Sequence, residues 1–231
     1  MQLKKVTHDE NPLKSRWYDD ACGTALALEL VGERWSLLIV RELMFGGRRF
    51  GELKASLPGI SANILTQRLE GMEASRILVR RKLPPPASVQ IYELTPWGYE
   101  SERAIQELGR WATKSPLHDR TLPLSAASLM LSFRTMISAK RAAGTDARVG
   151  FRIGAETFVA QVAGGGIVIR REDPAGTDVL FDGDPMTMAS IVYGGRPIAD
   201  AEGAGALTVT GDRQLAERFV TFFPLPPKML D

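Results

Sequence analysis

Residues 61–96 read SANILTQRLEGMEASRILVRRKLPPPASVQIYELTP, and they contain the patterns of a helix followed by a hairpin. Ser61 is a typical N-cap, because its hydroxyl can accept a hydrogen bond from a free backbone N–H of the first helical turn. Leu65, Leu69 and Met72 follow at i, i+4 and i+7, which places them on one face of a helix. The spacing therefore predicts that a helix starts at Ser61 and buries this apolar face.

The opposite side of this helix, residues 61–74, is rich in hydrogen-bonding groups. Asn63, Thr66, Gln67 and Glu70 all fall on it. In a helix-turn-helix protein the second helix lies in the major groove, and its N-terminal residues reach base edges. Amide side chains suit adenine, and hydroxyls suit several bases. We predict that four residues read base edges, namely Ser61, Asn63, Thr66 and Gln67.

A basic hairpin is predicted after the helix, from strand-like segments at residues 77–83 and 89–94. The prolines between them cannot donate to a strand ladder, so they belong in the connecting loop. Arg80, Arg81 and Lys82 lie on the first strand. Side chains alternate between the two faces of a strand, so these three cannot all point the same way. We expect at least one of them to contact the DNA backbone or the minor groove.

Short helices are predicted on both sides of this unit. Residues 21–31, 35–45 and 50–57 carry apolar helical patterns that end at glycine or proline. After the hairpin, Thr95-Pro96 has the chemistry of an N-cap followed by proline at the first helical position. Three short helices, a polar-faced helix and a basic hairpin follow one another in the order of a winged helix.

Three further arginines are candidates for phosphate contact. Arg48 and Arg49 precede the third short helix, and Arg68 lies one position round from the predicted base readers. Two alternatives stay open. Arg68 can instead pair with a nearby carboxylate such as Glu52 or Glu73, and the other two can belong to a solvated turn.

Several ordered and correctly spaced motifs between residues 20 and 115 resemble the HxlR-type regulators. The motifs are GERW (32–35), LLI (37–39), REL (41–43), GRRFGEL (47–53), LPGIS (57–61), LTQRL (65–69) and YELTPWG (92–98). The resemblance implies a winged-helix homodimer that represses or activates promoters, with the first and last helices of the domain at the dimer contact. The family often has a basic residue two positions after the serine that opens the recognition helix. Asn63 occupies that position here, which favours base readout over phosphate contact.

Cys22 lies at the position where a cysteine of this family can act as a redox or electrophile sensor. The alternative, which we favour from the sequence, is a small packed residue at a dimer contact. A sensing thiol needs a lowered pKa and an exposed sulfur. Because it is the only cysteine, an intrachain disulfide is impossible.

The composition changes after Ser115-Pro116, and we predict four segments: an arm (1–20), the winged-helix domain (21–116), a linker (117–123) and a second domain (124–231). The second domain is predicted to contain helices at 124–143, 184–193 and 212–222 and strands at 147–153, 156–162, 167–171, 177–181 and 206–210. Runs of strands with helices at the ends are typical of α+β proteins.

The second domain is similar, less specifically, to the sterol-carrier-protein type 2-like fold. The similarity rests on GDP (183–185), YGG (193–195) and LTVTGD (207–212). It implies a pocket for a lipid-like or aromatic effector. The candidate lining residues are Met130, Phe133, Phe151, Phe158, Met186, Met188 and Val192. The alternative is that these side chains form an ordinary core.

Composition excludes some function classes. The chain has 231 residues, a net charge of +2, one cysteine and two histidines. His8 and His118 lie in the arm and the linker, so neither a zinc cluster nor a Cys/His nucleophile is credible. We therefore expect no catalytic residues, no metal and no cofactor. No apolar run is long enough for a membrane span, and we expect a cytoplasmic protein.

Charge is unevenly distributed along the chain. Residues 41–82 hold nine Lys/Arg against four Asp/Glu, an excess that attracts phosphates but that solvated helix faces also produce. The expected partners are double-stranded DNA, a second copy of the chain and a hydrophobic small-molecule effector. The rival function is a lipid-like ligand carrier or scaffold in which the winged helix is a protein-interaction module.

Overall fold

Helix α4 (Ala62–Ala74) forms as its sequence predicts. Ser61 Oγ accepts a hydrogen bond from a backbone N–H of the first turn at 3.2 Å. Leu65, Leu69 and Met72 are buried. The structure, a computed structural model, describes residues 18–229. The predicted arm therefore lies outside the described residues except for residues 18–20.

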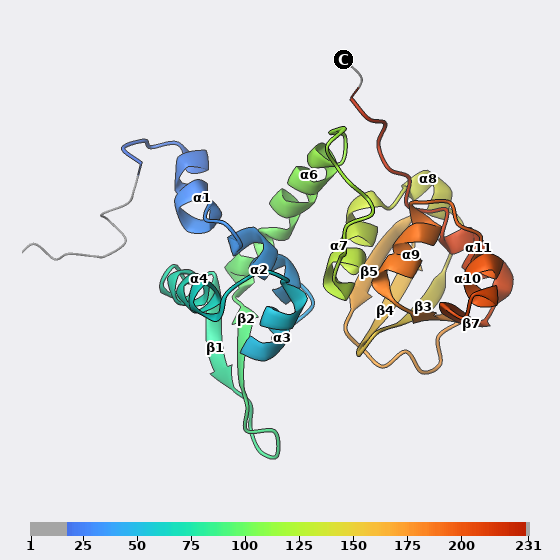
Figure 1. Ribbon diagram of the computed structural model, residues 1–231, viewed down its shortest axis with the longest axis horizontal. Helices are drawn as coiled ribbons and strands as arrows, with labels where there is room; N and C mark the ends of the chain where they lie inside the picture. The colour runs from blue at the N-terminus through green and yellow to red at the C-terminus, as the bar shows by residue number, and fades with distance from the viewer. Residues whose placement is uncertain (1–17, 230–231) are drawn as a thin grey trace, which may run out of the picture.

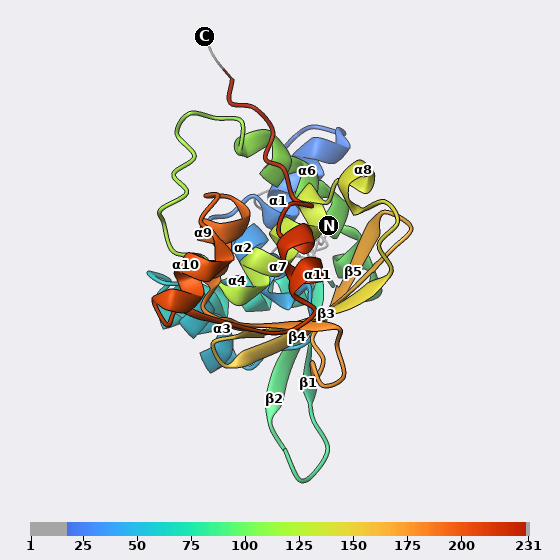
Figure 2. The ribbon, with the colours of Figure 1, turned by 90° about the vertical axis from the view of Figure 1, so that its right-hand side faces the viewer.

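The N-terminal lobe holds six helices and a two-stranded hairpin within the described residues (Figure 1). They are α1 (Gly23–Val31), α2 (Ser36–Leu43), α3 (Phe50–Ser56), α4, β1 (Leu78–Lys82), β2 (Gln90–Leu94), α5 (Pro96–Glu100) and α6 (Glu102–Ala112). Strands β1 and β2 are antiparallel, and their hairpin projects from the body of the lobe (Figures 1 and 2). This is the arrangement of a winged helix-turn-helix domain.

The helix predicted after Thr95 forms in two pieces. Thr95 Oγ1 accepts from the Gly98 N–H at 3.0 Å, which is the predicted cap. Gly98 allows α5 to lie close to the hairpin, because a Cβ at this position would collide with the carbonyl oxygen of Ile77. Ser101 then separates α5 from α6, and its hydroxyl donates to the Gly98 carbonyl at 2.6 Å. This side-chain bond to the backbone competes with a continuous helix.

The C-terminal lobe is a mixed five-stranded sheet with its helices packed over one face (Figures 1 and 2). Its elements are α7 (Ala126–Met136), α8 (Ala139–Ala142), β3 (Ala147–Ile153), β4 (Glu156–Ala163), β5 (Gly166–Arg170), β6 (Val179–Gly183), α9 (Pro185–Val192), α10 (Ile198–Gly203), β7 (Leu207–Gly211) and α11 (Arg213–Phe219). The strand order is β5-β4-β3-β6-β7, with β3 and β6 parallel and the other pairs antiparallel. The two lobes together form an α+β protein.

An aromatic cluster joins the sheet to its helices. Phe133 of α7 stacks on Phe223 with ring centroids 4.5 Å apart, and Phe151 of β3 stacks on Phe181 of β6 at 5.7 Å. Phe219 of α11 packs against all four rings. These side chains are at most 1% exposed. Buried aromatic side chains remove a large apolar area from water, so this cluster stabilises the packing of the helices on the sheet.

One prediction for this lobe is wrong, and one helix was missed. The single helix expected at residues 124–143 is broken at Ile137, whose backbone is extended. Ser138 follows with its N–H bonded to the Phe222 carbonyl at 2.8 Å, and it caps the separate helix α8. Helix α10 was not predicted, because its six residues are too few for a clear apolar period.

Helix α7 links the lobes, because it packs on α2 and α6 as well as on the sheet. Arg134 of α7 donates two bonds of 2.9 Å to the carboxylate of Glu102, at the start of α6. Its guanidinium also lies over the Phe45 ring, 4.3 Å from the centroid. No helix among residues 18–229 is both long and apolar enough to cross a bilayer.

Candidate nucleic-acid interface

The outer face of α4 carries the four predicted base readers. Ser61, Asn63, Thr66 and Gln67 are all exposed. Residues three and four apart lie on one side of a helix, so the last three form one polar surface. Within the described residues, these three side chains have no hydrogen-bonding partner in the chain. Their donors and acceptors are therefore available to an external ligand such as a base edge.

Arg68 faces the body of the lobe instead. Its Nη2 lies 2.7 Å from Glu33 Oε2, and its Nε donates to the Arg34 carbonyl at 3.1 Å. The arrangement ties α4 to the turn before α2. An ion pair with a carboxylate was the alternative that we gave for Arg68. The carboxylate is that of Glu33, and not that of either acid suggested by the sequence.

The hairpin cations point to different sides. Arg80 pairs with Glu73 at 3.0 Å and lies over the Tyr92 ring, whereas Arg81 pairs with Glu93 at 3.2 Å. Lys82 is exposed and has no ion pair among residues 18–229. Exposed ion pairs are worth only about 0–1 kcal/mol, so both arginines can exchange their carboxylate for a phosphate at little cost.

Arg48 and Arg49 are adjacent but have opposite environments. Arg49 is exposed, and its backbone N–H donates to Glu52 Oε2 at 2.8 Å, which caps α3. Arg48 is only 7% exposed, and its Nη1 donates to Glu156 Oε2 at 2.9 Å. The prediction that Arg48 contacts DNA is therefore corrected, because the C-terminal lobe covers it.

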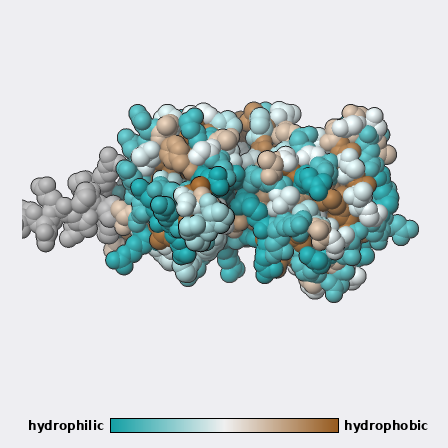
Figure 3. Space-filling view, turned by 90° about the horizontal axis from the view of Figure 1, so that it is seen from below, coloured by the Kyte–Doolittle hydropathy of each residue, from teal (hydrophilic) through white to brown (hydrophobic). Residues whose placement is uncertain are grey.

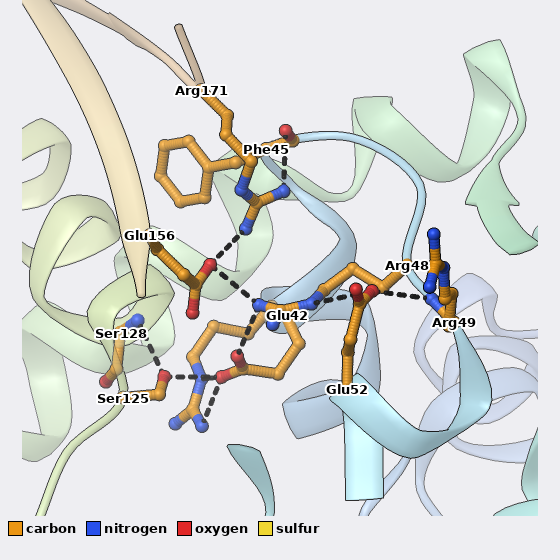
Figure 4. Close-up of polar contacts among 10 residues, drawn as sticks. Glu42, Phe45, Arg48, Arg49, Glu52, Ser125, Ser128, Glu156 and Arg171 are labelled. Atoms are coloured by element: carbon orange, nitrogen blue, oxygen red, sulfur yellow. Dashed lines mark hydrogen bonds and ion pairs between the residues drawn. The ribbon is translucent and has the colours of Figure 1, made fainter. Parts of the chain in front are cut away.

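Arg48 belongs to a polar cluster between the lobes, formed by Glu42, Arg48, Ser125, Glu156 and Arg171 (Figure 4). Glu156 Oε2 lies 2.9 Å from Arg48 and 2.7 Å from Arg171. Arg171 also donates to the Phe45 carbonyl at 3.0 Å. Sequence patterns gave no sign of this cluster, which we call the interlobe cluster.

Glu42 anchors the N-terminal side of the interlobe cluster. Its side chain is fully buried. Its Oε1 accepts from Ser125 Oγ at 2.6 Å and from Arg41 Nη2 at 2.8 Å (Figure 4). Its Oε2 has no hydrogen bond among the described residues and lies 3.8 Å from Arg48. Two positive charges therefore offset the burial of one carboxylate.

Exposed apolar side chains lie on α1, α5 and α6. The largest are Leu28 on α1, 52% exposed, and Trp111 on α6, 71% exposed. Leu26, Trp97 and Leu108 are also exposed. By contrast, much of the surface seen from the side towards which the hairpin projects is hydrophilic (Figure 3). Water-exposed tryptophan and leucine side chains are typical of a contact surface.

Cys22 is exposed and directly precedes α1. Hydrogen bonds from the backbone and side chain of Thr24, and then from the backbone of Ala25, lower the pKa of its thiol below the usual value. Exposure in a single chain fits a sensing thiol, and it also fits the residue packed at a dimer contact that we favoured from the sequence, so both interpretations stay predictions.

The predicted effector residues mostly fill the core. Met130, Phe133, Phe151, Phe158 and Met188 are 0% exposed. They pack between the sheet and its helices, which is the alternative interpretation. Met186 and Val192 line two separate cavities of the lobe. Among residues 18–229, no group of three or more His, Cys, Asp or Glu side chains is placed to hold a metal ion.

Comparison with known proteins finds relatives of the N-terminal lobe. The model of the HxlR-like helix-turn-helix family matches residues 30–119. The HTH-type transcriptional regulator YodB of Bacillus subtilis is 38% identical over 86 residues, which are 37% of this chain and 77% of YodB. The uncharacterized HTH-type transcriptional regulator YvaP of the same organism is 36% identical over 89 residues, 38% of this chain and 82% of YvaP.

Among solved structures, quinone-bound YodB from B. subtilis matches at 35% identity with a TM-score of 0.34, over 38% of this chain and 93% of that chain. The sequence matches, and not this structural similarity, show the family. Both sequence relatives are named as HTH-type transcriptional regulators. The chain belongs to the HxlR family of helix-turn-helix transcriptional regulators.

Proposed function

We propose that the protein is a sequence-specific repressor that binds double-stranded DNA as a homodimer. The observation that carries this proposal is the exposed face of α4, where Asn63, Thr66 and Gln67 have no partner among the described residues. Amides and hydroxyls left free at the N-terminal end of a helix are the groups that read base edges in the major groove. Ser61 caps the helix and keeps its hydroxyl proton for a base or a phosphate.

The cations around this face supply the contacts that do not depend on sequence. Arg49 and Lys82 are exposed without an ion pair in the described residues, and Arg80 and Arg81 hold only surface pairs. Phosphate contacts of this kind fix the register of the protein on the duplex. We assign backbone contact to these four residues and not to Arg48 or Arg68.

The homodimer is proposed to form through α1 and α6. Leu28 and Trp111 leave a large apolar area in water in the single chain, and a second copy would cover it. A two-fold dimer of winged helices meets half-sites about one helical turn apart, roughly 34–36 Å. The operator is therefore expected to be palindromic.

Control by a hydrophobic small molecule bound to the C-terminal lobe completes the proposal. The alternative function is a ligand carrier or scaffold with the winged helix as a protein-interaction module, which a cavity of about 750 Å³ beside α7 and α9 favours. Salt separates the two. Binding through several phosphates weakens steeply as salt rises, whereas binding of an apolar ligand does not.

The test is the selection of duplexes from a random pool by the full-length protein at two salt concentrations. Enrichment of a palindrome, together with a steep salt dependence, is the expected result. A failure to enrich any sequence, with or without added apolar ligands, would contradict the proposal and favour the carrier or scaffold.

A further inference from the structure

A cavity of about 750 Å³ lies between the chain that joins the lobes and the helices α7 and α9. Residues 118–124 form one of its walls, and Figure 2 shows this connection running down beside α9. Its volume is within the range of sites that hold a drug-sized ligand, about 300–1,000 Å³. Met186 is the one residue of the predicted pocket that lines it.

The cavity has an apolar part. Leu124, Met136, Met186, Tyr193 and Leu225 contribute to its lining. Methionine side chains adapt to ligands of irregular shape. Burial raises the pKa of Tyr193, whose hydroxyl lies 2.7 Å from Ser132 Oγ. The phenol therefore remains neutral and paired, so this part of the cavity suits a hydrocarbon chain or an aromatic ring.

The cavity also has a cationic part. Arg120 and Arg196 line it. Arg120 Nη1 donates to the Tyr193 carbonyl at 2.9 Å, and Arg196 Nη2 donates to the Asp200 carbonyl at 3.1 Å. Neither arginine has an ion pair with a carboxylate among residues 18–229. Asp119 also lines the cavity, and its carboxylate accepts hydrogen bonds from the N–H and the hydroxyl of Thr121. Guanidinium groups with free donors favour an anion, above all a carboxylate that can take two parallel hydrogen bonds.

His118 adds an unsatisfied polar atom to the same lining. Its Nδ1 is buried and has no hydrogen-bonding partner among the described residues. Burial, followed by the charges of Lys228 and Arg120, lowers the pKa of His118. Lys228 itself donates to the Ser115 carbonyl at 2.7 Å. A buried polar atom without a partner costs stability, and a ligand oxygen that accepted from this ring would remove that cost.

We propose that this cavity binds an amphipathic monocarboxylate. The apolar part of the ligand lies over Met136, Met186 and Leu225. The carboxylate of the ligand contacts Arg120 and Arg196. The inference rests on the proposed function only in naming this ligand as the effector, because binding itself needs no DNA. Residues 118–124 connect α6 of one lobe to α7 of the other, so an occupant is placed to change how the lobes are joined.

The test measures ligand binding to the full-length protein without DNA, by titration calorimetry and thermal unfolding. The probes are octanoate and octanol, which differ in the carboxylate, and naphthoate and naphthalenemethanol, which make the same comparison on an aromatic body. At least one of the two acids is expected to bind and to raise the unfolding temperature. Its affinity is expected to be about tenfold or more higher than that of the matching alcohol. Which acid binds distinguishes an aliphatic from an aromatic ligand. Equal affinity for acid and alcohol, or no binding of either acid, would overturn the proposal.

Variants locate the bound acid. The double variant Arg120→Gln, Arg196→Gln is expected to lower the affinity for the acid about tenfold or more and to leave the alcohol unchanged. Arg148→Gln removes an exposed cation of β3 that does not line the cavity, and it is expected to change neither. Met186→Trp is expected to narrow the apolar part of the cavity and to weaken the binding of both ligands. Acid binding that survives both cavity variants in a folded protein would place the ligand elsewhere. These readouts do not involve DNA, so they are independent of the duplex selection that tests the proposed function.

Discussion

Arg48 and Glu156 are 108 residues apart in the chain, and their side chains form a 2.9 Å ion pair between the two lobes. The arginine lies two residues before α3, and the glutamate is the first residue of β4. Arg48 also lies 3.8 Å from the buried Glu42 (Figure 4). The pair therefore connects the N-terminal lobe to the sheet of the C-terminal lobe, and it buries Arg48 between them.

Glu156→Ala is expected to lower the free energy of unfolding by about 2–3 kcal/mol, because it leaves Arg48 and Arg171 partly buried without their shared carboxylate. Urea unfolding measures the change. The matched control is Asp182→Ala, which breaks an exposed pair of 2.6 Å with Arg152 and is expected to cost less than about 1 kcal/mol. Equal losses in the free energy of unfolding for the two variants would mean that the interlobe cluster stabilises the fold no more than an exposed ion pair does.

Arg49→Gln and Arg48→Gln are expected to differ in their effect on DNA binding. Loss of one phosphate contact lowers the slope of log affinity against log salt by about one. We expect that reduction for Arg49→Gln, since its side chain is exposed and unpaired in the described residues. Arg48→Gln is expected to reduce stability and to keep the wild-type slope. Fluorescence anisotropy at several salt concentrations measures both, and a reduced slope for Arg48→Gln alone would contradict the assignment.

Trp111→Asp is expected to convert the dimer to a monomer, because it places a charge in the apolar surface of α6 that a second copy would cover. Size-exclusion chromatography with light scattering gives the mass. Val168→Asp is the control, since Val168 is 49% exposed on β5, outside this surface. A wild-type monomer, or a dimer that persists in Trp111→Asp, would show that α6 is not the contact.

The thiol of Cys22 is expected to react with iodoacetamide at a lower pH in the folded protein than in the urea-unfolded chain. The N–H groups of Thr24 and Ala25 stabilise the thiolate and lower its pKa. Since the thiolate is the reacting species, the midpoint of the rate against pH moves down on folding. A midpoint that is equal or higher in the folded protein would exclude Cys22 as a reactive sensor. Cys22→Ser controls for labelling at other groups.

Local sequence patterns predicted most of the secondary structure correctly. Caps such as Ser61 and Thr95 act on backbone groups two or three residues away, so their effect can be inferred from the sequence itself. The helix predicted at 124–143 was wrong because its break depends on a bond from Ser138 to the Phe222 carbonyl, a residue of the distant C-terminal segment.

The candidate site was predictable only where it depends on local geometry. The outer face of α4 follows from helical periodicity. The burial of Arg48 depends on Glu156, and no pattern around Arg48 contains that information. The cavity was missed for the same reason, since it needs Arg120 of the connection and Arg196 beyond α9 to line one space. Apolar composition alone pointed to Phe133 and Phe151, which form the core.

The most direct test of the account is the parallel selection of duplexes by the wild type, Gln67→Ala and Arg81→Ala. The N-terminal part of α4 is the claimed reader, so Gln67→Ala is expected to change the preferred base at one position of each half-site. Arg81→Ala is expected to weaken binding alike on all sequences and to keep the preference. If Gln67→Ala selects the wild-type sequence with wild-type affinity, α4 does not read the operator and the account is wrong.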